Sequence, residues 1–89
     1  MQLARVIGDV VATRKDENLV GLKLLLVQPL SPEREAVGRP LVAADAVGAG
    51  VGETVLIVSG SSARMAAGMK DCPIDAAVVG IVDAVEISE

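Results

Sequence analysis

The sequence predicts an all-β domain with one short helix, folded as a five-stranded OB-like β-barrel. Five short segments rich in Val, Ile and Leu are separated by stretches that contain Gly, Pro or charged residues. The chain has 89 residues, so residues 1–89 are expected to form a single domain. Strands as apolar as these would aggregate through exposed sheet edges, and closure into a barrel removes such edges.

The first predicted strand covers residues 2–13, where side chains alternate with the period of two that a strand requires. One face carries Arg5 and Asp9 among its apolar residues, which is typical of a partly buried interface. Gly8 in mid-strand indicates a bend or a close backbone approach. The face expected to fill a tight barrel interior consists of small apolar residues: Ala4, Val6, Gly8, Val10 and Ala12.

The second and third strands are predicted at residues 23–30 and 41–46. Leucines occupy both faces of the second strand, so both faces need cover, and Pro29 and Pro32 are expected to end it. A polar loop at residues 31–40, with two prolines and a glycine, separates the two strands.

Residues 45–64 form the stretch around which the chain is organised. Its glycines alternate with small apolar residues and permit positive φ angles or close backbone contact: Gly48, Gly50 and Gly52. Residues 54–58 are a β-branched run that predicts a buried strand. The following G-S-S-A-R predicts a short helix with Ser61 or Ser62 as N-cap, ending at Gly68.

The last strand is predicted at residues 76–87, after a connector at residues 69–75. Its apolar side chains fall on two faces, with Val78 and Val82 opposite the larger set of Val79, Ile81, Val85 and Ile87. Both faces of this strand therefore need cover.

Several residue types are missing, and their absence argues against whole classes of function. There is no Phe, Tyr or Trp to stack on a base, and the net charge of −4 opposes a phosphate backbone. There is no His, which is the commonest general base and metal ligand. Cys72 is the single cysteine, so no internal disulfide is possible. We expect no catalytic, cofactor or metal site, no nucleic acid and no membrane partner.

The apolar content is high for a small chain. Hydrophobic residues make up 52% of the sequence, and the mean hydropathy is +0.55. A domain of this size buries only about 60–65% of the surface that its unfolded chain exposes. Each Val or Leu side chain moved from water into an interface contributes roughly 1.5–3 kcal/mol. We therefore expect the chain to oligomerise, because an interface would bury the apolar surface that a single copy leaves exposed.

Four short motifs resemble binding or catalytic motifs, but their sequence context does not favour these functions. The G-A-G-V-G run lacks the G-x-G-x-x-G spacing of a dinucleotide site and precedes a strand instead of a helix. The helix start near Ser61 could hold an anion, but a capped helix with a paired Arg64 explains it as well. Lys70 follows a methionine as in biotin-carrier domains, although it is not at a hairpin tip. Cys72 has no activating histidine.

Carboxylates within or beside the apolar strands must be paired or hydrogen-bonded. None of them has metal-ligand spacing, so we interpret them as structural ion pairs, some of them between subunits. The carboxylates are Asp9, Asp45, Glu53 and Asp83, and the available cations are Arg5, Lys15, Lys23 and Arg64.

Three long motifs, taken in order, resemble the bacterial microcompartment vertex proteins of the EutN/CcmL family. They are the opening M-Q-L-A-R-V-I-G-D-V-V-A-T-R-K with the following L-V-G-L-K-L-L-L-V-Q-P-L, the central A-A-D-A-V-G-A-G-V-G-E-T-V-L-I-V-S-G-S-S-A-R, and the closing P-I-D-A-A-V-V-G-I-V-D-A-V-E. The resemblance covers nearly the whole chain, and the combination of motifs is specific.

This resemblance implies an OB-like barrel that assembles as a cyclic homopentamer and caps the five-fold vertices of a protein shell in the bacterial cytoplasm. The facets of such shells are built by a different, hexamer-forming family, which would be the second partner. The implied role is structural and not enzymatic. The residues that match the family's motifs and become candidates for assembly are Lys15, Asp45, Gly48, Gly50, Gly52, Glu53, Ser61, Ser62, Arg64 and Asp83.

Two alternatives belong to other classes of protein. An OB-fold module could bind single-stranded nucleic acid or an oligosaccharide, although the acidic balance and the lack of aromatic residues disfavour it. A small carrier or enzyme subunit would depend on Lys70.

Overall fold

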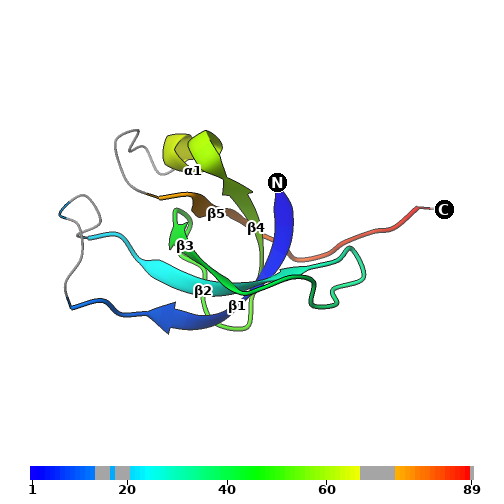
Figure 1. The fold of residues 1–89 in the computed structure, drawn as a ribbon. Coiled ribbons are helices and arrows are strands. Elements are labelled where there is room, and N and C mark those ends of the chain that lie inside the picture. The colour runs from blue at the N-terminus through cyan, green and yellow to red at the C-terminus, as the bar shows by residue number, and fades with distance from the viewer. Residues whose placement is uncertain (14–16, 18–20, 67–73, 89) are drawn as a thin grey trace.

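The computed structural model describes residues 1–13, 17, 21–66 and 74–88. Its strands close into one barrel in the order β1-β2-β3-β5-β4 (Figure 1). All neighbouring strands are antiparallel except the parallel pair of β3 and β5. The OB-like barrel with one short helix that the sequence predicts is confirmed. The elements are β1 (Gln2–Val10), β2 (Leu24–Leu30), β3 (Leu41–Asp45), β4 (Thr54–Ser59), α1 (Gly60–Ala66) and β5 (Ala76–Ile81).

The core is filled by small aliphatic side chains that point inward from alternate strand positions. In β1 these are Ala4 and Val6, as predicted, while Gly8 and Val10 farther along the strand are only half-buried. Among the residues that the structure describes, no polar or charged side chain belongs to the core cluster. The barrel is therefore narrow and dry. Its core cluster consists of Ala4, Val6, Leu25, Val27, Ala43, Ala49, Val55, Ile57, Ala76 and Val78.

Strand β1 ends at Val10, so the prediction that it continues to Thr13 is wrong. Its pairing with β2 stops at Val10, and beyond that point no described strand remains to accept its hydrogen bonds. The bend predicted at Gly8 is confirmed, because the register with β2 shifts between Val6 and Gly8.

Strand β2 runs through Pro29 to Leu30, so the prediction that Pro29 ends it is wrong. The carbonyl of Pro29 accepts a hydrogen bond from the Val37 N–H at 3.0 Å, in the loop and not in β1. The N and C=O of one strand residue face the same side, so the N–H that proline lacks would not have pointed toward β1. The ladder between β1 and β2 therefore loses nothing at this position.

Helix α1 begins at Gly60, directly after β4, so Ser61 and Ser62 lie within its first turn and the predicted N-cap is wrong. The φ angle of Gly60 is +61°, which lets the strand turn into the helix at one residue. The predicted helix end at Gly68 and most of the predicted connector lie outside the described residues. Within the described residues, no helix has the length and apolarity that a membrane span requires.

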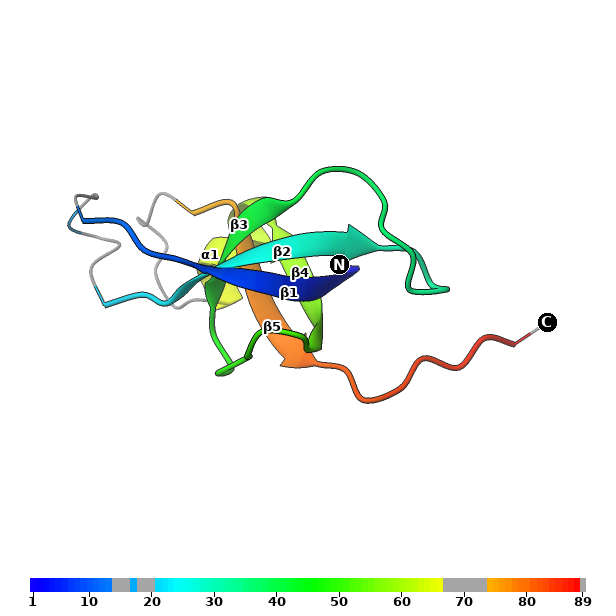
Figure 2. The same ribbon diagram turned by 90° about the horizontal axis from the view of Figure 1, so that it is seen from below.

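Strand β5 ends at Ile81, so the prediction that it reaches Ile87 is wrong. The Val82 N–H still donates to the carbonyl of Thr54 at 2.8 Å, but β4 begins at Thr54 and offers no further partner. Residues 82–88, called the tail below, continue as extended chain and leave the barrel (Figures 1 and 2).

Candidate functional site

Five of the ten candidate residues lie in one loop, residues 45–53, which joins β3 to β4. Asp45, the last residue of β3, organises its beginning. The Oδ1 atom of Asp45 accepts hydrogen bonds from the N–H groups of Val47 and Gly48, both at 3.0 Å. A side-chain oxygen that accepts from the backbone two and three residues ahead forms an Asx-type turn. Gly48 completes this turn at a φ of +81°.

Lys23 closes the loop from the side of β2. Its Nζ atom donates to the carbonyl of Ala49 at 2.9 Å and lies 3.9 Å from Oδ2 of Asp45. The Asp45 side chain is 1% exposed and that of Lys23 is 52% exposed. Because Lys23 is half in water, the ion pair itself contributes little, at most about 1 kcal/mol. The hydrogen bond to Ala49 instead fixes the path of the loop.

Ala49 anchors the middle of the loop in the barrel. Its side chain is fully buried and belongs to the core cluster, although the neighbouring Gly48 is exposed. From the sequence, Ala49 is predicted to be no more than a small residue between two glycines. Its alternation with Gly48 and Gly50 carried no signal of burial, because alanine is common in loops and in cores.

The end of the loop is a tight turn pinned to β1. The N–H of Glu53 donates to the carbonyl of Gly50 at 3.2 Å, and Gly52 has a φ of +92°, as the third residue of a type II turn requires. Oε1 of Glu53 accepts from the Gly50 N–H at 2.7 Å. Val6 of β1 exchanges two main-chain hydrogen bonds with this turn, donating to Glu53 and accepting from Gly52.

The remaining candidates lie elsewhere. Ser61 and Ser62 are exposed on α1, and Asp83 is exposed in the tail. Lys15 and the side chain of Arg64 lie outside the described residues, as do Lys70 and Cys72. The structure therefore brings together Asp45, Gly48, Gly50, Gly52 and Glu53, whereas Ser61, Ser62 and Asp83 lie on other segments.

The predicted ion pairs are confirmed for one carboxylate. Asp45 pairs with Lys23, whereas Glu53 is held by a backbone N–H. Asp9 and Asp83 are exposed and make no ion pair with the residues that the structure describes. They are in water, so they do not need the partner that burial would require.

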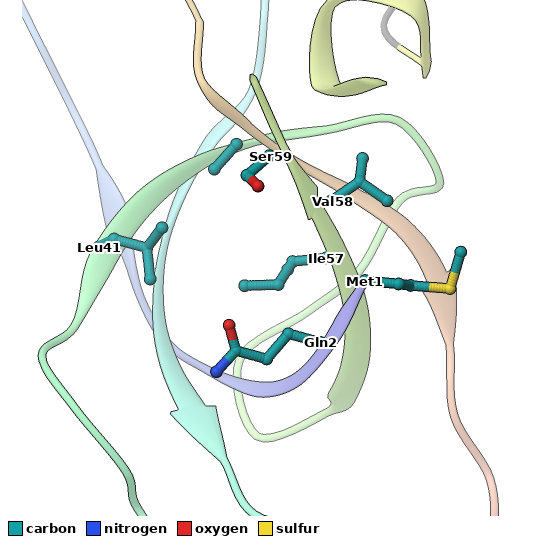
Figure 3. Close-up of a pocket in the computed structure, with 7 residues that line it drawn as sticks. Met1, Gln2, Leu41, Ile57, Val58 and Ser59 are labelled. Carbon is teal, nitrogen blue, oxygen red and sulfur yellow. The ribbon is translucent and has the colours of Figure 1, made fainter. Parts of the chain in front are cut away.

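The barrel also has an open mouth, a pocket of about 130 Å³ between the start of β1 and the neighbouring strand ends (Figure 3). The polar groups of its side chains are the amide of Gln2 and the hydroxyl of Ser59. Neither group titrates near neutral pH, so the side chains of this lining offer no general acid or base. Within the described residues there is also no group of three or more acidic, His or Cys side chains that could hold a metal ion.

The chain matches, over residues 1–83, the family model described as ethanolamine utilisation protein EutN/carboxysome. It is 52% identical over 88 residues to the carboxysome shell vertex protein CcmL of Synechocystis, covering 99% of this chain and 88% of that protein. It is 53% identical over 87 residues to the microcompartment shell vertex protein PduN of Salmonella typhimurium, covering 93% and 96%.

A solved structure agrees with these sequence matches. The pentameric microcompartment shell protein GrpN of Rhodospirillum rubrum superposes with a TM-score of 0.90 at 50% identity, covering 99% of this chain and all of that one. Fold and sequence therefore match over the whole barrel, the loop at residues 45–53 included. The chain belongs to the EutN/CcmL family of bacterial microcompartment shell vertex proteins, a family of structural proteins and not of enzymes.

Proposed function

We propose that this chain assembles as a homopentamer that closes the five-fold vertices of a microcompartment shell, where it meets hexamer-forming facet proteins. Membership of the shell vertex family carries the proposal. The surface of the chain supports it, because ten large hydrophobic side chains of the described residues are exposed. A closed barrel with a filled interior has no other means of covering them.

A cyclic pentamer uses a heterologous interface, in which one surface of each copy meets a different surface of the next. The exposed hydrophobic side chains are spread over several elements. Ile7 projects from β1, Val42 from β3, Val51 from the loop and Ile87 from the tail. This distribution supports a ring better than it supports a two-fold dimer.

The rigid loop supports the proposal in a second way. Its backbone is fixed within the subunit by Asp45, Lys23 and Glu53, so assembly does not require it to become ordered. A preorganised surface loses less conformational entropy on binding. Its glycines carry no side chains and therefore allow another backbone to approach closely.

Native mass spectrometry of the purified chain tests the pentamer. The expected species has five times the 9.1 kDa mass of the chain. A monomer at micromolar concentration would contradict the proposal.

Co-expression with shell facet hexamers tests the vertex role. Shells made with this chain should be closed polyhedra in electron micrographs, and shells made without it should be open or elongated. The control is co-expression with a variant whose barrel is strongly destabilised, such as Ala49→Asp. Shells that close equally well without the chain would overturn the vertex role while leaving the pentamer intact.

A further inference from the structure

We propose that the tail, residues 82–88, adds as a sixth strand to the second half of β1 in a neighbouring copy of this chain. This inference deepens the proposed function and rests on the homopentamer. The tail of each copy then links it to the next around the ring.

The second half of β1 is an open strand edge. β4 pairs with β1 only from Gln2 to Arg5, and the turn at Gly52 and Glu53 covers Val6. From there to Val10, β2 is the only described strand that pairs with β1. An unpaired edge of a sheet is a template for another strand. The described part of this edge carries no proline or lysine, and its protection is confined to the bulge between Val6 and Gly8 and to the charge of Asp9.

The side chains beside this edge are apolar and exposed. Ile7 is 43% exposed and Val11 is 88% exposed. Val51, at 61%, lies in the turn that hydrogen-bonds to Val6. The glycine loop thus flanks the open edge, and the space beside Gly52, where an added Cβ would meet nothing within 4 Å, leaves room for an incoming backbone.

The tail has the sequence of a strand but no strand to pair with. Its period of two predicts a strand as far as Ile87, yet the ladder stops at Ile81 because β4 begins at Thr54. Ile87 is 58% exposed and Val85 is half-buried. Unpaired β-branched chain next to a sheet is the usual donor in strand addition.

The open edge of β1 and the tail have the length and the positions that a contact between neighbouring copies in a ring requires. Seven extended residues span roughly 23 Å, and the two shorter dimensions of the chain are 23 and 22 Å. A tail can therefore cross the width of a neighbouring barrel. The second half of β1 and the tail project toward opposite ends of the molecule (Figures 1 and 2). A head-to-tail contact requires its two surfaces on different sides of the subunit.

Charge restricts the register of the added strand. The tail carries Asp83 and Glu86 and no cation, while β1 carries Arg5 and Asp9. Like charges directly opposite each other in a sheet are destabilising. The pairing should therefore keep Asp83 and Glu86 from lying directly opposite Asp9, which a register with Ile87 opposite Ile7 allows.

Disulfide trapping tests the contact directly. In a Cys72→Ser background, Ile7→Cys combined with Ile87→Cys should give, on oxidation, a ladder of covalent species up to the pentamer. The control pair is Ile7→Cys with Met65→Cys, since Met65 is exposed on α1 and is not part of the proposed contact. A pentamer in which the first pair links no better than the control pair would overturn the inference.

Proline substitution tests the hydrogen bonding. Ala84→Pro with Val85→Pro removes one amide hydrogen from each side of the tail and should raise the concentration for half-assembly at least about tenfold, since several bonds are lost per ring. The matched control, Ala84→Thr with Val85→Thr, keeps both amides and should assemble normally. Unchanged assembly of the proline variant would overturn the inference and leave the pentamer standing. A monomeric parent chain would overturn both proposals.

Discussion

Two segments project from the barrel, and they are stabilised in opposite ways. The loop at residues 45–53 is held by side chains of Asp45, Glu53 and Lys23 and by two main-chain hydrogen bonds to Val6. The tail at residues 82–88 begins with the hydrogen bond from Val82 to Thr54, and no hydrogen bond joins its later described residues to the barrel. Both are irregular by secondary structure, yet only the loop has its conformation fixed by its own chain.

The difference matters for the proposed assembly, because the two segments would contribute to it in different ways. A fixed loop presents the same shape before and after binding, so it contributes complementarity at little entropic loss. A segment that becomes ordered on binding loses entropy but gains a full set of new contacts. The following substitutions separate the two segments, because a change in the loop should affect the barrel and a change in the tail should not.

The largest effect is expected from Ala49→Asp. It places an unpaired carboxylate in the core cluster and should lower the free energy of unfolding by about 4 kcal/mol, a large part of what a domain of this size has. Urea unfolding followed by far-UV circular dichroism measures it, since the chain has no aromatic fluorophore. Ala84→Asp in the exposed tail is the control and should change stability by less than about 0.5 kcal/mol. Equal losses would contradict the comparison.

Asp45→Ala should have the next largest effect. It removes the acceptor for two backbone N–H groups and the partner of Lys23, so we expect the free energy of unfolding to fall by about 2 kcal/mol. Asp45→Asn keeps an oxygen acceptor and should lose about 1 kcal/mol or less. If the two variants are equally destabilised in urea unfolding, the charge and not the turn holds the loop.

Gly52→Ala is expected to lower the free energy of unfolding by about 1–2 kcal/mol, because the φ of +92° at Gly52 is strained for any residue with a Cβ atom. Gly50→Ala is the matched control. Gly50 has no positive φ, and an added Cβ would meet only the end of the Glu53 side chain at 3.4 Å. Its loss of stability should be the smaller of the two. The reverse order would mean that close packing, and not backbone conformation, explains the glycines.

The smallest effect is expected from Ile87→Ser. It should leave the far-UV spectrum of the barrel unchanged and weaken assembly by about 1 kcal/mol per subunit through lost apolar burial. Native mass spectrometry at a series of dilutions measures the pentamer fraction. Met65→Ser removes another exposed hydrophobic side chain and should leave the pentamer fraction unchanged. If both variants dissociate alike, the tail has no special role.

Alternation of side chains predicted the barrel well, because a narrow closed sheet leaves only one arrangement for strands with small inward faces. Ala4 and Val6 lie inward, where their parity places them. The errors occur at strand ends. Pro29 lies within β2 because its missing N–H would have faced a loop, which a local pattern does not reveal.

The candidate site was predicted in part. The motif that contains Asp45, Gly48, Gly50, Gly52 and Glu53 does form one structural unit. Its two closing contacts come from residues far away in the chain, the side chain of Lys23 and the main chain of Val6. No local pattern could indicate them, because they depend on how β1, β2 and the loop meet.

Residue type and order are enough to predict the β-class, the closed barrel, the absence of aromatic packing and the resemblance to a shell vertex family. The positions at which the strands stop depend instead on the tertiary fold. A strand ends where its partner ends, and the partner is set by topology. The last seven described residues have the pattern of a strand, but within one copy of the chain they have no edge to join.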